Sequence, residues 1–204
     1  MLQNRVDPFG HLIRTSARGA WMGNRGLLHD EHQEIRRPFK LKAWITCKLE
    51  FKGWHRKVMT PNRYTELFFL DEATAFSAGH RPCFECRRED ALAFKQAWIR
   101  GNPEYGFDEK TPIGKIDDIL HAERPRADNS KRTREVMDAN LPDGACILWN
   151  DQPYLVRGEQ ILRWTPFGYA EPMDKPGPGK ITLLTPGSVV NAFRAGYVPQ
   201  MATP

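Results

Sequence analysis

The sequence predicts an α+β fold, with a cysteine knuckle in the N-terminal half and a strand-rich C-terminal half capped by helices. Apolar and polar residues alternate over 41–51 and again between 145 and 164, which is typical of half-buried strands. Helical periodicity, bounded by capping residues, occurs in the middle of the chain and near its end. Strands and helices do not alternate regularly, which favours α+β over a parallel βαβ architecture.

The N-terminal half begins without a clear pattern. Residues 1–40 are expected to be loop-like, because they carry several glycines and little periodicity. The clearest strand is Leu41–Phe51, whose apolar face carries Cys47 and whose charged face carries Trp44. A turn leads to a second strand around Tyr64–Leu70.

Three helices are predicted in the middle of the chain. Asp71 is expected to cap a short helix over 72–78, since an aspartate side chain accepts hydrogen bonds from the first free amides of a helix, and Gly79 ends that helix. A second helix is predicted over Glu89–Arg100. Thr111-Pro112 is typical of the start of a third.

The C-terminal half is predicted to be rich in strands, two of which form a hairpin around 150–152. The predicted strands lie at 145–149, 153–157, 161–164 and 181–184. The charged segment 124–135 is expected to be a loop that runs into a helix near Met137, and 172–180 a flexible loop. Thr185-Pro186 opens a last helix that continues through Arg194.

At 204 residues the chain is long enough for one large domain or two small ones. We expect a basic part over 1–100 and an α+β part over 101–204, either separate or continuous. The apolar runs are too short for a membrane span, and the first residues lack the apolar core of a secretory signal. A cytoplasmic protein without a membrane partner is therefore expected, with its cysteines as thiols or ligands rather than disulfides. The sequence indicates no oligomeric state.

Positive charge is concentrated in residues 1–100, which hold 18 Lys and Arg against 11 Asp and Glu, a net of +7. Residues 101–204 hold 12 against 14, a net of −2. Such asymmetry favours a polyanion, such as nucleic acid, as the partner of the first part. An ordinary solvated basic surface is the alternative.

Cys83 and Cys86 stand two residues apart on a tight turn made by Pro82, which is half of a tetrahedral zinc site. Such a site takes further thiolates or imidazoles, and we predict Cys47 as the third ligand and His55 as the fourth. His80 and Cys146 are the alternative candidates for the fourth ligand. The alternative for Cys47 and Cys146 is a role as small core residues, and for the Cys83/Cys86 pair a redox role.

Basic and aromatic residues in the first half are predicted to contact phosphates or to stack on bases. Three arginines flank the cysteine pair, and further basic and aromatic residues surround His55. Another arginine lies in the glycine-rich segment 18–30, for which a long surface loop is the alternative. The predicted nucleic-acid-binding residues are Arg25, Trp54, Arg56, Lys57, Arg81, Arg87 and Arg88.

Residues 66–90 resemble the zinc-binding segment of the Ada-type DNA-repair domain. The resemblance is carried by Phe68-Phe69, Glu72-Ala73, Ala78-Gly79, Arg81-Pro82-Cys83 and Cys86-Arg87. It implies a small DNA-binding module whose zinc is held by four cysteines, one of which accepts a methyl group from a damaged backbone phosphate. Related versions accompany nucleases and replace an upstream cysteine with histidine. The upstream pair of close cysteines is absent here, so the acceptor would be Cys47.

A last group of polar residues lies on the third predicted helix, where Asp117, His121 and Arg124 share one face. An acid–imidazole pair can orient a general base, and an arginine can neutralise a phosphoryl oxygen. Asp117, His121 and Glu123 are the predicted catalytic residues for the case that the chain is an enzyme. An ordinary polar helix face is the alternative.

Together these features predict a zinc-containing DNA-binding protein that acts in DNA repair or processing, with RNA left open as a partner. A DNA-acting enzyme is the first alternative, as a nuclease, a lesion glycosylase or an alkyl acceptor. A redox or regulatory C-x-x-C protein is the second.

Overall fold

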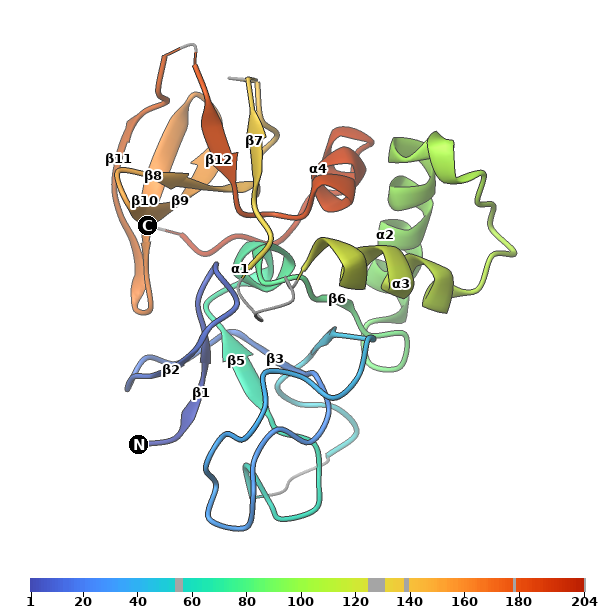
Figure 1. Cartoon of the computed structure of the whole chain (residues 1–204), viewed down its shortest axis with the longest axis vertical. Coiled ribbons are helices and arrows are strands. Elements are labelled where there is room, and N and C mark those ends of the chain that lie inside the picture. The colour runs from blue at the N-terminus through green and yellow to red at the C-terminus, as the bar shows by residue number, and fades with distance from the viewer. Residues whose placement is uncertain (54–56, 125–130, 138–139, 178, 204) are drawn as a thin grey trace.

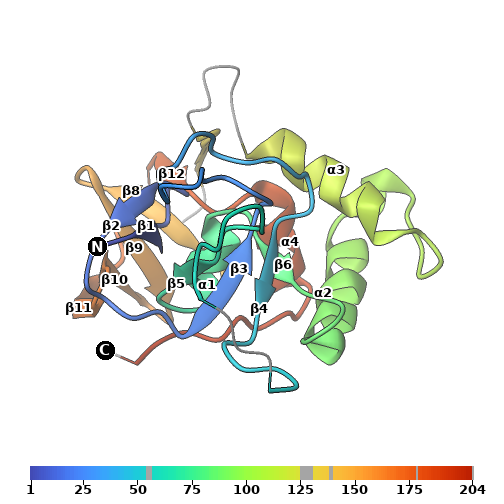
Figure 2. The same ribbon diagram turned by 90° about the horizontal axis from the view of Figure 1, so that it is seen from below.

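The computed structural model describes residues 1–53, 57–124, 131–137, 140–177 and 179–203. Two six-stranded sheets come from the two halves of the chain, and helices pack beside and between them (Figure 1, Figure 2). The predicted α+β class is confirmed. Among the described residues, no helix is both long and apolar enough to cross a membrane.

The first sheet has the strand order β2-β1-β5-β3-β4-β6. Its strands are β1 (Gln3–Val6), β2 (Leu12–Arg14), β3 (Trp21–Asn24), β4 (Ile45–Cys47), β5 (Leu67–Phe69) and β6 (Arg81–Pro82). The expectation of loops throughout residues 1–40 was therefore wrong. Strands β1 to β3 are too short for alternation to show in the sequence. In β3, a Cβ at Gly23 would lie 2.2 Å from the Ile45 carbonyl oxygen, so close strand pairing requires this glycine.

Strand β4 is shorter than the predicted 41–51. It pairs antiparallel with β3 and parallel with β6, and only its central residues have neighbours on both sides. Leu41 and Leu49, which the alternation placed inward, are exposed because they lie beyond this paired region. Trp44, which the alternation placed on the charged face, is instead buried just before the strand.

The helices begin close to where the sequence predicts them. They are α1 (Glu72–Ser77), α2 (Arg88–Gly101), α3 (Ile113–Glu123) and α4 (Gly187–Arg194), with a 3-10 turn η1 (Pro103–Tyr105) after α2. The predicted cap of α1 is present, since the Thr74 amide donates to Asp71 Oδ1 at 2.8 Å. Helices α2 and α4 pack side by side around a core that includes Phe94, Trp98 and Phe193 (Figure 1).

The second sheet has the order β11-β10-β9-β8-β12-β7. Its strands are β7 (Arg134–Val136), β8 (Cys146–Trp149), β9 (Gln152–Arg157), β10 (Gln160–Thr165), β11 (Gly168–Asp174) and β12 (Ile181–Leu183). The predicted hairpin is present, and Asn150 and Asp151 take positive φ angles of 46° and 58°, which suit a two-residue hairpin turn. Two expectations were wrong. Strand β7 stands where a helix near Met137 was expected, because it pairs with the distant β12, and β11 extends into the loop expected over 172–180, because it forms a hairpin with β10.

Helix α1 lies between the two sheets and contacts β5 in one and β8 in the other (Figure 1). Its first residues also hold the C-terminal segment. Tyr169 Oη donates to Asp71 Oδ2 at 2.8 Å, and Tyr197 Oη donates to Glu72 Oε1 at 2.8 Å. These buried bonds anchor the start of α1, the helix that precedes β6 and the cysteine pair in the chain.

Candidate metal centre

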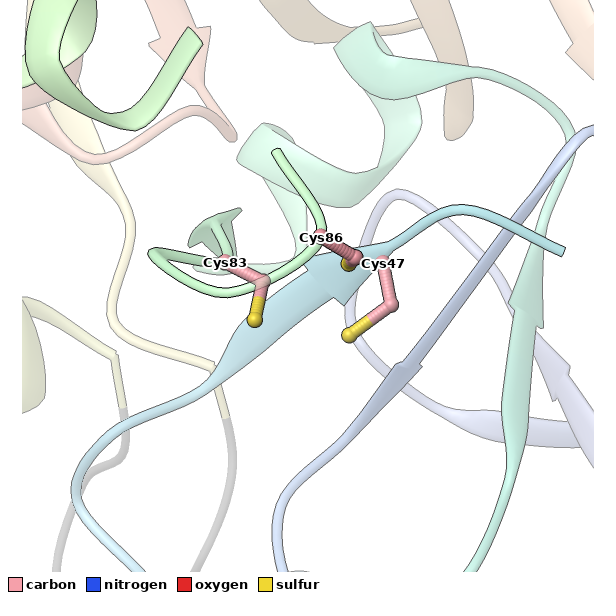
Figure 3. A group of neighbouring side chains, drawn as sticks. All are labelled: Cys47, Cys83 and Cys86. Atoms are coloured by element: carbon pink, nitrogen blue, oxygen red, sulfur yellow. The ribbon is translucent and has the colours of Figure 1, made fainter. Parts of the chain in front are cut away.

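Three cysteines from two distant segments meet at the edge of the first sheet (Figure 3). Cys47 is the last residue of β4, and Cys83 and Cys86 lie in the loop between β6 and α2. Their Sγ atoms all lie within 4.8 Å of one another. Each of the three residues is buried. The structure thus brings Cys47 to the Cys83/Cys86 pair, in an arrangement that can hold a metal ion.

Backbone hydrogen bonds between β4 and the knuckle (residues 79–88) position the three sulfurs. Gly79 takes a φ of +88°, which ends α1 and turns the chain back toward β4. The Cys83 amide donates to the Thr46 carbonyl at 3.0 Å, next to Cys47. The Arg87 amide then donates to the Cys83 carbonyl at 3.0 Å, which closes the tight turn of the C-x-x-C motif.

The electrostatics of the cluster favour thiolates. The Cys47 thiol donates a hydrogen bond to Cys83 and, together with backbone amides, lowers the pKa of Cys83 to about 5. One of these amides is that of Glu85, which donates to Cys83 Sγ at 3.4 Å. Cys47 also lowers the pKa of Cys86, while its own pKa is raised because it is the donor to both. The lowered pKa values favour the thiolate forms of Cys83 and Cys86, and the thiolate is the form in which cysteine binds a metal cation.

Apolar side chains surround the sulfurs. Met22, Ile45 and Phe51 pack against the cluster and are themselves partly buried. This surrounding limits the access of water to the thiolates and strengthens their interaction with a cation.

The three residues named as possible fourth ligands stand apart. His55 lies outside the described residues. His80 is buried, and its Nε2 accepts a hydrogen bond from Arg25 Nε at 3.3 Å, so its ring is engaged elsewhere. Cys146 is buried in β8 of the second sheet. Within the described chain, the group of potential ligands contains neither His80 nor Cys146.

Two of the arginines beside the knuckle are inside the fold, contrary to the expectation that they contact phosphates. Arg81 donates from Nε and Nη2 to the two oxygens of Asp117, at 2.8 and 2.7 Å. Arg87 Nη2 donates to Glu72 Oε1 at 2.6 Å. Both guanidiniums are buried with their carboxylates. A buried arginine needs such a partner, and these partners are too far along the chain to be read from the knuckle itself.

The other predicted nucleic-acid-binding residues are exposed, buried or outside the described residues. Arg88, the first residue of α2, and Lys57 are exposed. Trp54 and Arg56 lie outside the described residues. Arg25 is buried and lines a cavity, whereas the alternative expectation placed it in a surface loop.

The three residues expected as catalytic lie on α3 but contact different partners. Asp117 pairs with Arg81, and Glu123 accepts hydrogen bonds from the amide and hydroxyl of Ser188. The His121 ring packs edge-on against the Phe39 ring, with centroids 5.1 Å apart, and burial lowers its pKa. In the described part of the chain no hydrogen bond joins any two of the three. The structure therefore does not assemble them into one acid–base site.

Sequence reasoning overlooked Lys131, whose Nζ donates to the carbonyl oxygens of Pro8 and Ser77. Nothing in the sequence of the charged segment around it distinguishes this lysine from the other basic residues there. No family model, curated protein or solved structure matches the chain. What the three cysteines bind is therefore derived from their geometry and chemistry.

Proposed function

We propose that the chain is a zinc-containing DNA-binding protein that acts in DNA repair or processing. The observation that carries this proposal is the convergence of the Cys47, Cys83 and Cys86 sulfurs within 4.8 Å. In a tetrahedral site with Zn–S bonds of about 2.3 Å, the sulfurs stand about 3.8 Å apart. A small contraction of the cluster around the ion is enough to reach that geometry.

Zinc is the ion that fits this donor set best. Soft thiolate ligands select zinc over magnesium or calcium, and a C-x-x-C turn with backbone amides on its sulfurs is typical of structural zinc sites. His55, eight residues after Cys47, is our proposed fourth ligand, which completes a Cys3His set. Bound zinc would hold the end of β4 to the loop before α2, in addition to the hydrogen bond from the Cys83 amide to the Thr46 carbonyl.

Exposed basic residues that flank the ligands in the sequence support DNA as the partner. Lys48 follows Cys47 directly, Lys57 lies beyond it, and Arg88 follows Cys86 at the start of α2. Phosphate contacts by such residues supply most of the sequence-independent affinity for DNA. The zinc site would fix the two segments that carry these cations in one relative position.

A salt titration of DNA binding tests the proposal. The affinity of the zinc-loaded chain for a short DNA duplex is measured by fluorescence anisotropy at several salt concentrations. Replacing both Lys57 and Arg88 with alanine should lower the slope of log affinity against log salt by about 2, at about 0.9 per phosphate contact. Arg163→Ala is the matched control, because Arg163 is exposed on β10 of the second sheet.

Three outcomes are informative. A reduced salt slope in the double variant, with an unchanged slope in Arg163→Ala, supports DNA binding through Lys57 and Arg88. Absent or salt-independent binding of the wild-type chain refutes it. Tighter binding to single-stranded RNA than to DNA would move the partner to RNA.

A further inference from the structure

A cavity of about 320 Å³ lies next to the segment that leads into β4. Its wall includes Phe9, Phe39, the end of α1 and the end of α3. Trp44, three residues before Cys47, also lines it, but the three cysteines do not. The cavity is therefore separate from the candidate metal centre, although the same stretch of chain serves both.

Arg25 reaches this cavity from the turn after β3, with a guanidinium that the protein satisfies only in part. The residue is 2% exposed. Its Nε donates to His80 Nε2 at 3.3 Å, and its Nη1 donates to the Gly10 carbonyl at 3.0 Å. Its Nη2 has no hydrogen-bond partner within the described chain. A buried charged donor without an acceptor is costly, so this N–H group is available to an acceptor beyond the described residues.

Arg124, at the end of α3, repeats this arrangement from another wall of the cavity. It is 5% exposed, and its Nη1 donates to the Lys42 carbonyl at 2.7 Å. Its Nε and Nη2 have no partner among the described residues. Gly79 makes room for this side chain, because a Cβ there would come within 2.7 Å of it.

Trp44 holds the two guanidiniums together. The Cζ atoms of Arg25 and Arg124 lie 4.1 and 4.6 Å from the centre of its ring. Stacking on an aromatic face fixes the plane of a guanidinium without using its N–H groups. Arg25 and Arg124, each with an unpartnered N–H group, therefore line the same cavity and stack on the same ring.

The charge of the lining points to a dianion. Lys131 adds a third cation, and its two carbonyl partners leave one of its three N–H donors for another acceptor. Glu123 is the one acidic residue among the described residues that line the cavity, and both its oxygens accept from Ser188. Asp7, whose charge acts on Arg25 and Lys131 from nearby, accepts a hydrogen bond from the His11 amide. The two arginines against one lining carboxylate leave a charge of +1, which protonation of Lys131, whose pKa burial lowers to about 7, raises to +2.

We propose that this cavity binds a phosphate monoester that carries a flat ring, of the class of a nucleoside 5′-monophosphate. Two guanidiniums with free N–H groups match the oxygens of a phosphate dianion. The aromatic rings of Phe9 and Phe39 supply apolar walls for a base. A cavity of about 320 Å³ is at the small end of ligand sites, which favours one nucleotide over an oligonucleotide. The proposal requires neither zinc at the three cysteines nor DNA binding by Lys57 and Arg88.

Calorimetric titration of the full chain with thymidine 5′-monophosphate and with thymidine tests the phosphate part of this proposal. The monophosphate should bind at least tenfold more tightly than the nucleoside, since only the phosphate reaches the free N–H groups. Equal affinities, or no binding of either at millimolar concentration, would overturn the proposal. This comparison uses the wild-type protein and does not depend on the folding of any variant.

The variant Arg124→Met tests whether the monophosphate binds in this cavity. The affinity for thymidine 5′-monophosphate should fall at least tenfold, while Arg163→Met, the matched exposed control, should leave it unchanged. Arg124→Lys keeps the charge but loses the planar fork, and it replaces Arg124→Met if that variant does not fold. Wild-type affinity in whichever of the two variants folds overturns the assignment to this cavity.

The nucleotide has two possible sources, a free mononucleotide or the 5′ end of a DNA strand. Competition against bound thymidine 5′-monophosphate distinguishes them. Displacement by a 5′-phosphorylated oligonucleotide, but not by its 5′-hydroxyl form, assigns the site to strand ends. Failure of both oligonucleotides to compete assigns it to free nucleotide. Loss of DNA binding in the Lys57/Arg88 double variant with retained monophosphate binding separates this site from the DNA-binding face.

Discussion

Replacing Asp117 with asparagine tests whether Arg81 is a structural residue. Arg81 and Asp117 are only 5% and 6% exposed and share two hydrogen bonds, at 2.8 and 2.7 Å. Asparagine presents one oxygen and one N–H group to the guanidinium, so a buried charge loses its counter-charge. Breaking a buried ion pair by removing one partner costs about 3–5 kcal/mol. We expect Asp117→Asn to lower the free energy of unfolding by about 3 kcal/mol, measured by urea denaturation.

The neighbouring residue offers a matched control. Asp118 pairs with Lys42 at 2.8 Å, but the two side chains are 51% and 64% exposed. An exposed pair contributes about 0–1 kcal/mol, so Asp118→Asn should cost less than about 1 kcal/mol. Similar costs for the two variants would refute the reasoning. So would a stable Asp117→Asn protein with weakened DNA binding, because Arg81 would then act at the phosphate backbone.

Three further predictions concern the close pairing of β3 with β4, the buried counter-charge of Arg87 and the charge of Lys131. Gly23→Ala should cost more than about 2 kcal/mol in urea unfolding, because its methyl would lie 2.2 Å from a β4 carbonyl oxygen, whereas Gly114→Ala meets no atom within 4 Å and should cost nothing. Glu72→Gln should cost about 3 kcal/mol, since it removes the buried counter-charge of Arg87; a cost below about 1 kcal/mol would contradict this. Burial lowers the pKa of Lys131 from 10.5 to about 7 in the folded protein, so the unfolded chain binds more protons between these values. The unfolding free energy of the wild type minus that of Lys131→Met should therefore rise with pH across this window, and a flat difference would contradict the burial of its charge.

Local sequence signals were sufficient to predict the helices and the hairpin. Asp71 marks the start of α1 by its side-chain oxygen, and Asn150-Asp151 marks the hairpin by its tolerance of positive φ. The meeting of Cys47 with Cys83 and Cys86 was also predictable, because a strand face places Cys47 where neighbouring segments can reach it. The strands of residues 1–40 escaped prediction because each is short, and because β1 and β3 also depend on the distant β5 for hydrogen bonds.

Burial of charge could not be predicted from the sequence. Arg81 and Arg87 look like phosphate contacts beside the knuckle, yet each has a carboxylate partner that only the fold brings near. The cavity is a further case, since Arg25, Arg124 and Lys131 come from three distant segments. Their meeting at one cavity depends on the fold, which no local pattern of residues encodes.

The zinc content of the purified full chain tests the central claim most directly. Elemental analysis should find about one zinc ion per chain, as expected for a closed structural site. Cys83→Ser should remove the ion, whereas Cys146→Ser should retain it, because Cys146 is buried in the second sheet, away from the cluster. Less than half an equivalent of zinc in the wild type, or equal zinc contents in the two variants, would contradict the claim that Cys47, Cys83 and Cys86 form a metal centre.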